Sequence, residues 1–221
     1  MNIKIIAATI AVAALVSGCK FVSVSPKLSG DLENNVKELI ANSRGDKAAE
    51  DCVTNDYPVG DSISKIVIDG AGDMDFSIGA PSLTISAPVR IANHLKITEE
   101  GNSLCIGTDG TRIINWENVD ITMSLPSLSC LECNGAIDFE AGNLDCGGDL
   151  SIELNGAGDI DIDNLTVGKL RIEINGAGDI DLEGTAASAY IEVNGVGDVD
   201  ITGLICDDIK TEKNGIGRIR K

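Results

Sequence analysis

Apolar and polar residues alternate along five similar segments in the second half of the chain, and each segment reaches an Asn-Gly pair. The fullest copies are SIELNGAGDID, RIEINGAGDID and YIEVNGVGDVD. Apolar residues stand one and three positions before the asparagine in four of the five copies, with a glutamate between them. A period of two is typical of a β-strand, so these segments predict strands with the apolar side chains inside and the glutamates outside.

The asparagines of these segments follow one another at intervals of 21, 20, 19 and 20 residues. Such a regular period is typical of proteins whose repeats stack and bury one another's apolar side chains. Each period holds a strand before the Asn-Gly pair, a strand after it and a third apolar group. The pattern predicts an all-β domain at residues 62–221, a single-stranded parallel β-helix solenoid with about 20 residues per coil. The stacked asparagines are expected to form a structural ladder of side-chain hydrogen bonds: Asn134, Asn155, Asn175, Asn194 and Asn214.

The Asn-Gly pairs are expected at corners with positive φ, which asparagine tolerates and glycine prefers. A two-residue Asn-Gly hairpin is the alternative local structure. Hairpins would pair adjacent strands antiparallel and would leave the regular spacing unexplained, so we favour the corner.

The chain before the regular segments is less uniform. Residues 66–76 are a first copy of the pattern, with Asp69 in the asparagine position. Residues 19–61 are predicted to be a tether, in which residues 31–43 form an amphipathic helix that covers the open end of the domain. Shorter strands are expected at residues 82–86, 95–98, 104–107 and 119–124.

Residues 1–18 have the features of a bacterial lipoprotein signal peptide. Lys4 precedes a short apolar stretch, and the sequence Val-Ser-Gly-Cys ending at Cys19 resembles a lipobox. The resemblance implies cleavage before Cys19 and attachment to the membrane through a lipid on its thiol. Lys20, rather than aspartate, follows the lipid site and points to an outer-membrane lipoprotein, on the periplasmic or the surface side of the cell envelope. An ordinary cleaved signal with an incidental cysteine is the alternative.

The composition excludes some classes of ligand. The chain carries 17 basic and 35 acidic residues, a formal net charge of −18. Nucleic acid is excluded as a ligand because phosphate binding needs a basic patch. Only 3% of the residues are aromatic, which argues against an aromatic platform for stacking sugars.

The acidic residues after the Gly-x-Gly turns are the strongest candidates for ligand chemistry. Neighbouring strands lie about 4.8 Å apart, so aligned carboxylates repel one another unless they are screened or bridged. Calcium accepts several oxygen ligands in flexible geometry and is the one cofactor that we consider. A solvated acidic face that prevents edge-to-edge aggregation is the alternative. The candidate calcium ligands are Asp159, Asp161, Asp179, Asp181, Asp198 and Asp200.

These carboxylates do not predict catalysis. A glycosidase needs two carboxylates in different environments beside a cleft, whereas the acidic pairs here are almost the same in every segment. The Cys130-Leu-Glu-Cys133 motif is not expected to bind zinc either, because strand alternation places its two thiols on opposite faces. The pairing of Cys52, Cys105 and Cys130 stays open.

Three features together resemble a known family: the Gly-x-Gly turns with Asn-Gly corners, the segment TMSLPSL at residues 122–128, and the lipoprotein start. Through these features the chain resembles bacterial envelope proteins with the "putative auto-transporter adhesin, head GIN" domain, over about residues 62–221. The resemblance implies a right-handed parallel β-helix shaped like the pectin lyases, without catalytic residues and with adhesion as the suggested role.

These features predict a non-catalytic envelope lipoprotein that binds a protein or glycan ligand through its acidic face. A β-helix protein that binds or degrades polysaccharide is one alternative, and a structural envelope spacer is another. The oligomeric state is not determined by the sequence.

Overall fold

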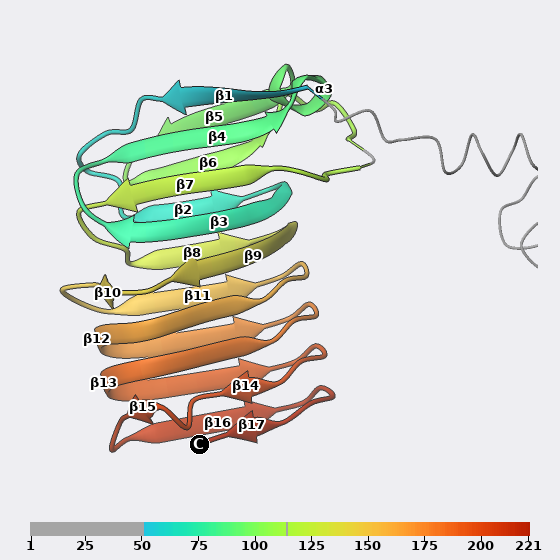
Figure 1. Ribbon diagram of the computed structural model, residues 1–221. Coiled ribbons are helices and arrows are strands. Elements are labelled where there is room, and N and C mark those ends of the chain that lie inside the picture. The colour runs from blue at the N-terminus through green and yellow to red at the C-terminus, as the bar shows by residue number, and fades with distance from the viewer. Residues whose placement is uncertain (1–50, 114) are drawn as a thin grey trace, which may run out of the picture. The chain divides into compact units, whose positions relative to one another are not determined.

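The computed structural model describes residues 51–113 and 115–221 (Figure 1). The predicted signal peptide, Cys19, the helix at residues 31–43 and most of the tether lie outside the described residues. No helix in the described ranges is both long and apolar enough to cross a membrane.

All described strands belong to one sheet of 17 strands, and the described helix α3 (Val89–Ala92) is a single turn. The first nine strands are β1 (Cys52–Tyr57), β2 (Lys65–Ile68), β3 (Ala71–Ile78), β4 (Ser82–Pro88), β5 (Leu95–Glu100), β6 (Ser103–Thr108), β7 (Asp120–Leu125), β8 (Cys130–Cys133) and β9 (Ala136–Ala141). The other eight are β10 (Leu144–Asp145), β11 (Leu150–Leu154), β12 (Ile160–Ile174), β13 (Ile180–Val193), β14 (Val199–Asp200), β15 (Leu204–Ile205), β16 (Ile209–Lys213) and β17 (Ile219–Arg220). The short strands predicted between residues 82 and 124 are present as β4 to β7.

The sheet is mixed and nearly closed into a barrel-like shape, so the prediction of a right-handed, single-stranded parallel β-helix solenoid is wrong. Three strand pairs are antiparallel: β1–β4, β4–β7 and β5–β6. The β5–β6 hairpin turns at Gly101, which has a φ of 64°. Strands β12 and β13 are 15 and 14 residues long, where separate short faces were expected. Alternation with a period of two is the same in parallel and antiparallel strands, so it could not reveal these differences.

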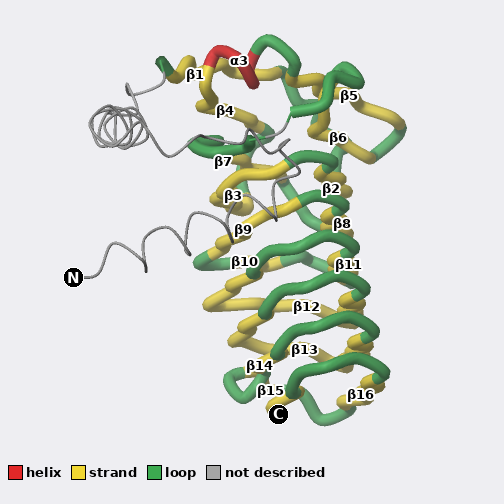
Figure 2. Tube along the Cα trace, turned by 90° about the vertical axis from the view of Figure 1, so that its right-hand side faces the viewer, coloured by secondary structure: helices red, strands yellow, loops and turns green. Residues whose placement is uncertain are grey.

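From β8 onward, strands that lie about twenty residues apart in sequence pair in parallel, and they follow one another in chain order in both views (Figures 1 and 2). Ile172 on β12 pairs with Ile152 on β11 and with Ile191 on β13. Parallel pairing in this register places equivalent residues beside each other on successive strands. We call each such set of residues a column.

The core of the domain is made of these aligned apolar columns. Ile152, Ile172 and Ile191 are each at most 1% exposed, as the alternation predicts. Phe76 and Phe139 stack inside the core with their ring centroids 5.9 Å apart. Among the described residues no polar or charged side chain is buried. Burial of an aliphatic side chain of this size contributes about 1.5–3 kcal/mol, so the columns supply most of the stabilising free energy.

Glycine is required at the Asn-Gly turns by close backbone contact, and the expectation of positive φ there is wrong. Neither these asparagines nor the glycines that follow them are among the described residues with positive φ. Instead, a Cβ on each of these glycines would lie 1.6–1.9 Å from the carbonyl oxygen of the glycine in the preceding turn. No side chain fits at that distance, so the stacked turns need glycine for space rather than for conformation.

Replacing one of these glycines by alanine should therefore destabilise the domain strongly. The added Cβ of Gly176→Ala would lie 1.7 Å from the carbonyl oxygen of Gly156. We expect the free energy of unfolding to fall by about 3 kcal/mol or more, at the upper end of overpacking effects, measured by urea denaturation followed by circular dichroism. In the control Gly148→Ala the new Cβ has no neighbour within 4 Å, and a change of at most about 0.5 kcal/mol is expected. Equal effects of the two substitutions would contradict the contact argument.

Candidate functional site

Two columns of acidic residues follow the Asn-Gly turns, and we call them together the acidic face. They lie on β3 and β9, and at or directly before the starts of β12, β13 and β14. Asp161 pairs with Glu140 on β9 and with Asp181 on β13. The first acidic column is Asp73, Asp138, Asp159, Asp179 and Asp198. The second acidic column is Asp75, Glu140, Asp161, Asp181 and Asp200.

Carboxylates of the first acidic column are bound to the backbone of the next strand. The backbone N–H of Asp179 donates to Asp159 Oδ1 at 3.0 Å, and that of Asp198 donates to Asp179 Oδ1 at 2.7 Å. Asp159 N–H donates to Asp138 Oδ1 at 3.3 Å in the same way. Because these bonds link each turn to the next, the first column holds neighbouring strands together as well as carrying charge. This role was not predicted, and its signal in the sequence is the aspartate that directly follows the second glycine of each turn.

The second acidic column borders a hollow of about 300 Å³. Its lining residues are Asp75, Phe76, Glu140, Ala141, Gly142, Asp161 and Asp163. The pKa of the Asp161 carboxyl is raised, mainly by burial and further by the charges of Asp163 and Asp181. A raised carboxyl pKa means that the ionised form is less stable in the folded protein, so Asp161 opposes folding at neutral pH. A positively charged group in the hollow would relieve this repulsion.

Arginines neutralise the last pair of aspartates. Arg218 Nη2 lies 2.6 Å from Asp198 Oδ2, and Arg220 Nη1 lies 2.7 Å from Asp200 Oδ2. The pKa of Asp200 falls to about 2, first because of the hydrogen bond from Thr202 and then because of Arg220. A lowered carboxyl pKa stabilises the fold above the ordinary aspartate value, and that contribution is lost as the pH falls toward 2. A cation would have to displace the arginines to reach these two carboxylates.

The six predicted calcium ligands lie in two different environments. Asp198 and Asp200 are held by arginines, whereas Asp159, Asp161, Asp179 and Asp181 form the central part of the acidic face. Within residues 51–113 and 115–221, no three Asp, Glu, His or Cys side chains are grouped so that they could hold a metal ion. Calcium would therefore have to draw carboxylates of neighbouring strands together.

The asparagine side chains are joined by hydrogen bonds that all run in one direction. Each Nδ2 donates to the Oδ1 of the preceding asparagine at 3.0–3.1 Å, from Asn155 to Asn214. At the start, Asn134 Nδ2 donates to Asp69 Oδ1 at 2.9 Å. A carboxylate only accepts, so aspartate suits the first position and orients every amide that follows. This direction explains why the first copy of the pattern has Asp69 where the later copies have asparagine.

Glutamates on the strands before the turns reinforce this ladder. Asn175 Nδ2 also donates to Glu173 Oε1 at 3.0 Å. The pKa of Glu173 is lowered, first by this hydrogen bond and then by Arg171, whose guanidinium lies 4.9 Å from the ring centroid of Tyr190. These side chains satisfy one another, so this part of the surface has a structural role.

The cysteines are thiols in the described part of the chain. Cys133 is buried in the core, whereas Cys130 is half-buried on the other side of its strand. The two therefore face opposite sides of β8 and cannot share a metal ion. Cys52 and Cys105, whose pairing the sequence left open, are also free.

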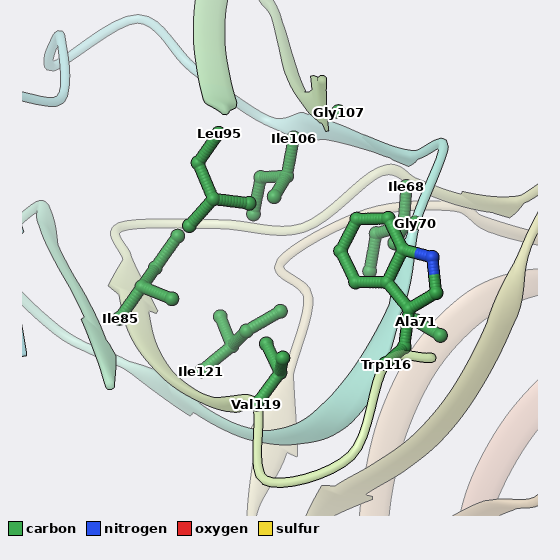
Figure 3. Close-up of a pocket in the computed structure, with 10 residues that line it drawn as sticks. All are labelled: Ile68, Gly70, Ala71, Ile85, Leu95, Ile106, Gly107, Trp116, Val119 and Ile121. Carbon is green, nitrogen blue, oxygen red and sulfur yellow. The ribbon is translucent and has the colours of Figure 1, made fainter. Parts of the chain in front are cut away.

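A small apolar cavity lies beside the first turn, where Trp116 packs against Gly70 (Figure 3). A Cβ on Gly70 would lie 2.9 Å from the indole ring, so the ring rests directly on the backbone of the turn. The cavity has a volume of about 10 Å³. Pockets for small molecules have roughly 300–1,000 Å³, so this cavity is a packing defect rather than a ligand site.

Comparison with known proteins gives one family and one fold. The family model described as "Putative auto-transporter adhesin, head GIN domain" matches residues 62–220. The structure is similar to a putative adhesin from Bacteroides fragilis NCTC 9343, with 23% identity, a TM-score of 0.62, and coverage of 78% of this chain and 97% of that one. It is also similar to a putative adhesin from Parabacteroides distasonis ATCC 8503, with 16% identity, a TM-score of 0.51, and coverage of 77% and 82%. No curated protein matches the chain. At identities this low, the similarity shows a shared fold and nothing about function.

The direction of the asparagine ladder can be tested by two opposite substitutions. Asn175→Asp removes the Nδ2 donor and places carboxylate oxygens against Asn155 Oδ1 and Glu173 Oε1. We expect a loss of about 1–2 kcal/mol in the free energy of unfolding at neutral pH, measured by urea denaturation. Asp69→Asn keeps the acceptor that Asn134 needs, and a change within about 0.5 kcal/mol is expected. If both substitutions cost the same, the ladder has no direction.

Proposed function

The chain belongs to the putative auto-transporter adhesin, head GIN domain family, and from this premise we propose that it is a non-catalytic adhesin of the cell envelope. The region that defines the family, residues 62–220, also contains the acidic face. The domain that defines the family would thus also provide the binding surface.

The observation that carries this proposal is the alignment of the two acidic columns along neighbouring strands. Parallel pairing repeats the carboxylates at the spacing of β-strands, about 4.8 Å, so the negative potential extends along the domain instead of concentrating at one point. A surface of this kind attracts lysine and arginine side chains of a partner and accelerates the encounter. The net charge of −18 acts in the same direction.

The hollow beside Asp161 supplies a place where such a partner could be anchored. Four carboxylates line it, from Asp75, Glu140, Asp161 and Asp163, and the pKa of Asp161 is raised, first by burial and then by the charges of Asp163 and Asp181. A lysine or arginine side chain would restore the charge balance and bury its apolar stem against the hollow wall. We therefore favour a protein partner with a basic surface over a neutral glycan.

We further propose that Cys19 attaches the protein to the outer membrane through a lipid. The lipobox-like sequence that ends at Cys19 supports this anchor, and an adhesin needs such an attachment to hold a cell to its partner. The acidic domain would then be tethered to the membrane by the residues that precede it.

Lipid attachment is tested by metabolic labelling of the full chain with a radioactive fatty acid. The wild-type chain should take up the label and partition into detergent, whereas Cys19→Ser should stay unlabelled and aqueous, because the serine hydroxyl does not replace the thiol. Cys52→Ser is the matched control and should be labelled like the wild type. Labelling of Cys19→Ser would contradict the proposal.

Adhesion through the acidic face is tested by a charge reversal that spares the scaffold. Asp161, Asp163 and Asp181 are suitable for replacement by lysine, because the first acidic column also binds the backbone. Attachment of cells that display the full chain to a surface coated with a lysine-rich polypeptide should fall by about tenfold or more, which corresponds to roughly 1.4 kcal/mol. The control reverses Glu100, Asp207 and Asp208, which are exposed and lie outside the acidic face, so the net charge changes equally.

Equal losses in the two triple variants would show that net charge, and not the acidic face, causes attachment.

The same assay with added calcium and with a chelator tests whether calcium takes part in attachment. If the chelator abolishes attachment of the wild type, calcium bridges the acidic face to its partner. If the chelator has no effect, calcium has no part in adhesion.

A further inference from the structure

The five Asn-Gly pairs are chemically alike, but the structure holds them unequally. Asparagine followed by glycine is prone to spontaneous deamidation, because glycine has no side chain to hinder attack by its own backbone nitrogen. We propose that Asn214–Gly215 is a site of spontaneous deamidation in the folded protein, and that the other four pairs are protected by the sheet. The reaction needs no enzyme, metal or oxidant.

The chemistry sets the geometric requirement. The backbone nitrogen of Gly215 loses its proton and attacks Cγ of Asn214, the bond from Cγ to Nδ2 breaks, and ammonia leaves. The resulting succinimide ring is opened by water at either carbonyl, which yields aspartate or isoaspartate. The side-chain amide must rotate toward the backbone, and the glycine N–H must be released from any hydrogen bond. Contacts that fix either group therefore slow the reaction.

A pair within the sheet is fixed on both sides. The Asn175 amide donates to Asn155 Oδ1 and Glu173 Oε1, and its Oδ1 accepts from Asn194. Gly176 N–H donates to the Leu154 carbonyl at 3.0 Å. The carbonyl of Gly176 in turn accepts the N–H of Val196 on the next turn at 2.9 Å. Attack in this pair requires all of these bonds to open together.

The last pair is fixed on one side. Asn214 Nδ2 donates to Asn194 Oδ1 at 3.0 Å, and Gly215 N–H donates to the Val193 carbonyl at 3.0 Å. Within the described sheet β16 pairs with β13, and no later turn stacks on residues 214–217. In the described sheet, Asn214 Oδ1 therefore accepts no bond from a following asparagine. Glu212, beside Asn214, is exposed, whereas the equivalent Glu173 is half-buried. Ends of elements open more easily than their middles, so this pair reaches the reactive geometry more often.

The pair at the other end of the ladder separates two explanations of protection. Asn134 has a full set of side-chain bonds, to Asp69, Glu132 and Asn155. The other four turn glycines donate their N–H to a backbone carbonyl, whereas the Gly135 N–H donates to the sulfur of Cys133, a weaker acceptor. If the ladder and the stacked turns protect, Asn134 should be slow. If the glycine N–H bond alone protects, Asn134 should be the fastest.

Deamidation of Asn214 would change the end of the ladder. The product carries a carboxylate in place of the amide, so the bond from Nδ2 to Asn194 Oδ1 is lost and two acceptors face each other. The carboxylate also adds a negative charge near Glu212. The protein would thus accumulate a more acidic form with time, altered at this end of the sheet.

The test is peptide mapping of the full-length wild-type chain by mass spectrometry during incubation in mildly alkaline buffer. All five sites are followed in one sample, so each serves as a control for the others. We expect Asn214 to deamidate at least about tenfold faster than Asn175, which corresponds to roughly 1.4 kcal/mol in the free energy of local opening. In denaturing urea the five rates should converge, because the sheet no longer protects any pair. Similar rates at all five sites in the folded protein, or a faster reaction at Asn134, would overturn the proposal.

Discussion

The close contact between glycine backbones at successive turns is the constraint on which the rest of the structure depends. A methyl group at Gly156, Gly176 or Gly195 would lie within 2 Å of a neighbouring carbonyl oxygen, so only glycine allows the turns to stack. This contact allows strands that lie about twenty residues apart in the sequence to pair in parallel. The pairing fixes which residues become neighbours. The aliphatic core columns, the asparagine ladder and the acidic columns all follow from that register.

The same register creates an electrostatic problem and part of its solution. Carboxylates on adjacent strands repel, by roughly 1 kcal/mol for an exposed pair in water. In the first acidic column the backbone N–H of the next strand offsets this repulsion, as between Asp179 N–H and Asp159 Oδ1. Arg218 and Arg220 offset it at the last strands. The second acidic column has no such backbone bond around Asp161, whose pKa is raised. Negative charge in the second acidic column is therefore left without a backbone donor beside the hollow.

This division of labour between two chemically similar columns supports a binding role for one of them. The first acidic column is needed by the fold, so its replacement would confuse a loss of binding with a loss of stability. The second column and Asp163 can be changed with less cost to the strands. Membership of the putative adhesin family agrees with the binding role that we propose, and the two solved structures share the fold. The ladder of asparagines links the successive turns of that framework by side-chain hydrogen bonds.

The sequence by itself determined which side chains face the core, because alternation along one strand requires no knowledge of its neighbours. Ile172 inside and Glu173 outside follow from that rule, and so does the separation of Cys130 from Cys133. Only the tertiary structure decided strand direction, the mixed and nearly closed sheet, and the reason for glycine at the turns. It also decided which aspartates bind backbone and which face the hollow. These features depend on contacts between residues far apart in the chain, and a period of two is the same whichever strand lies alongside.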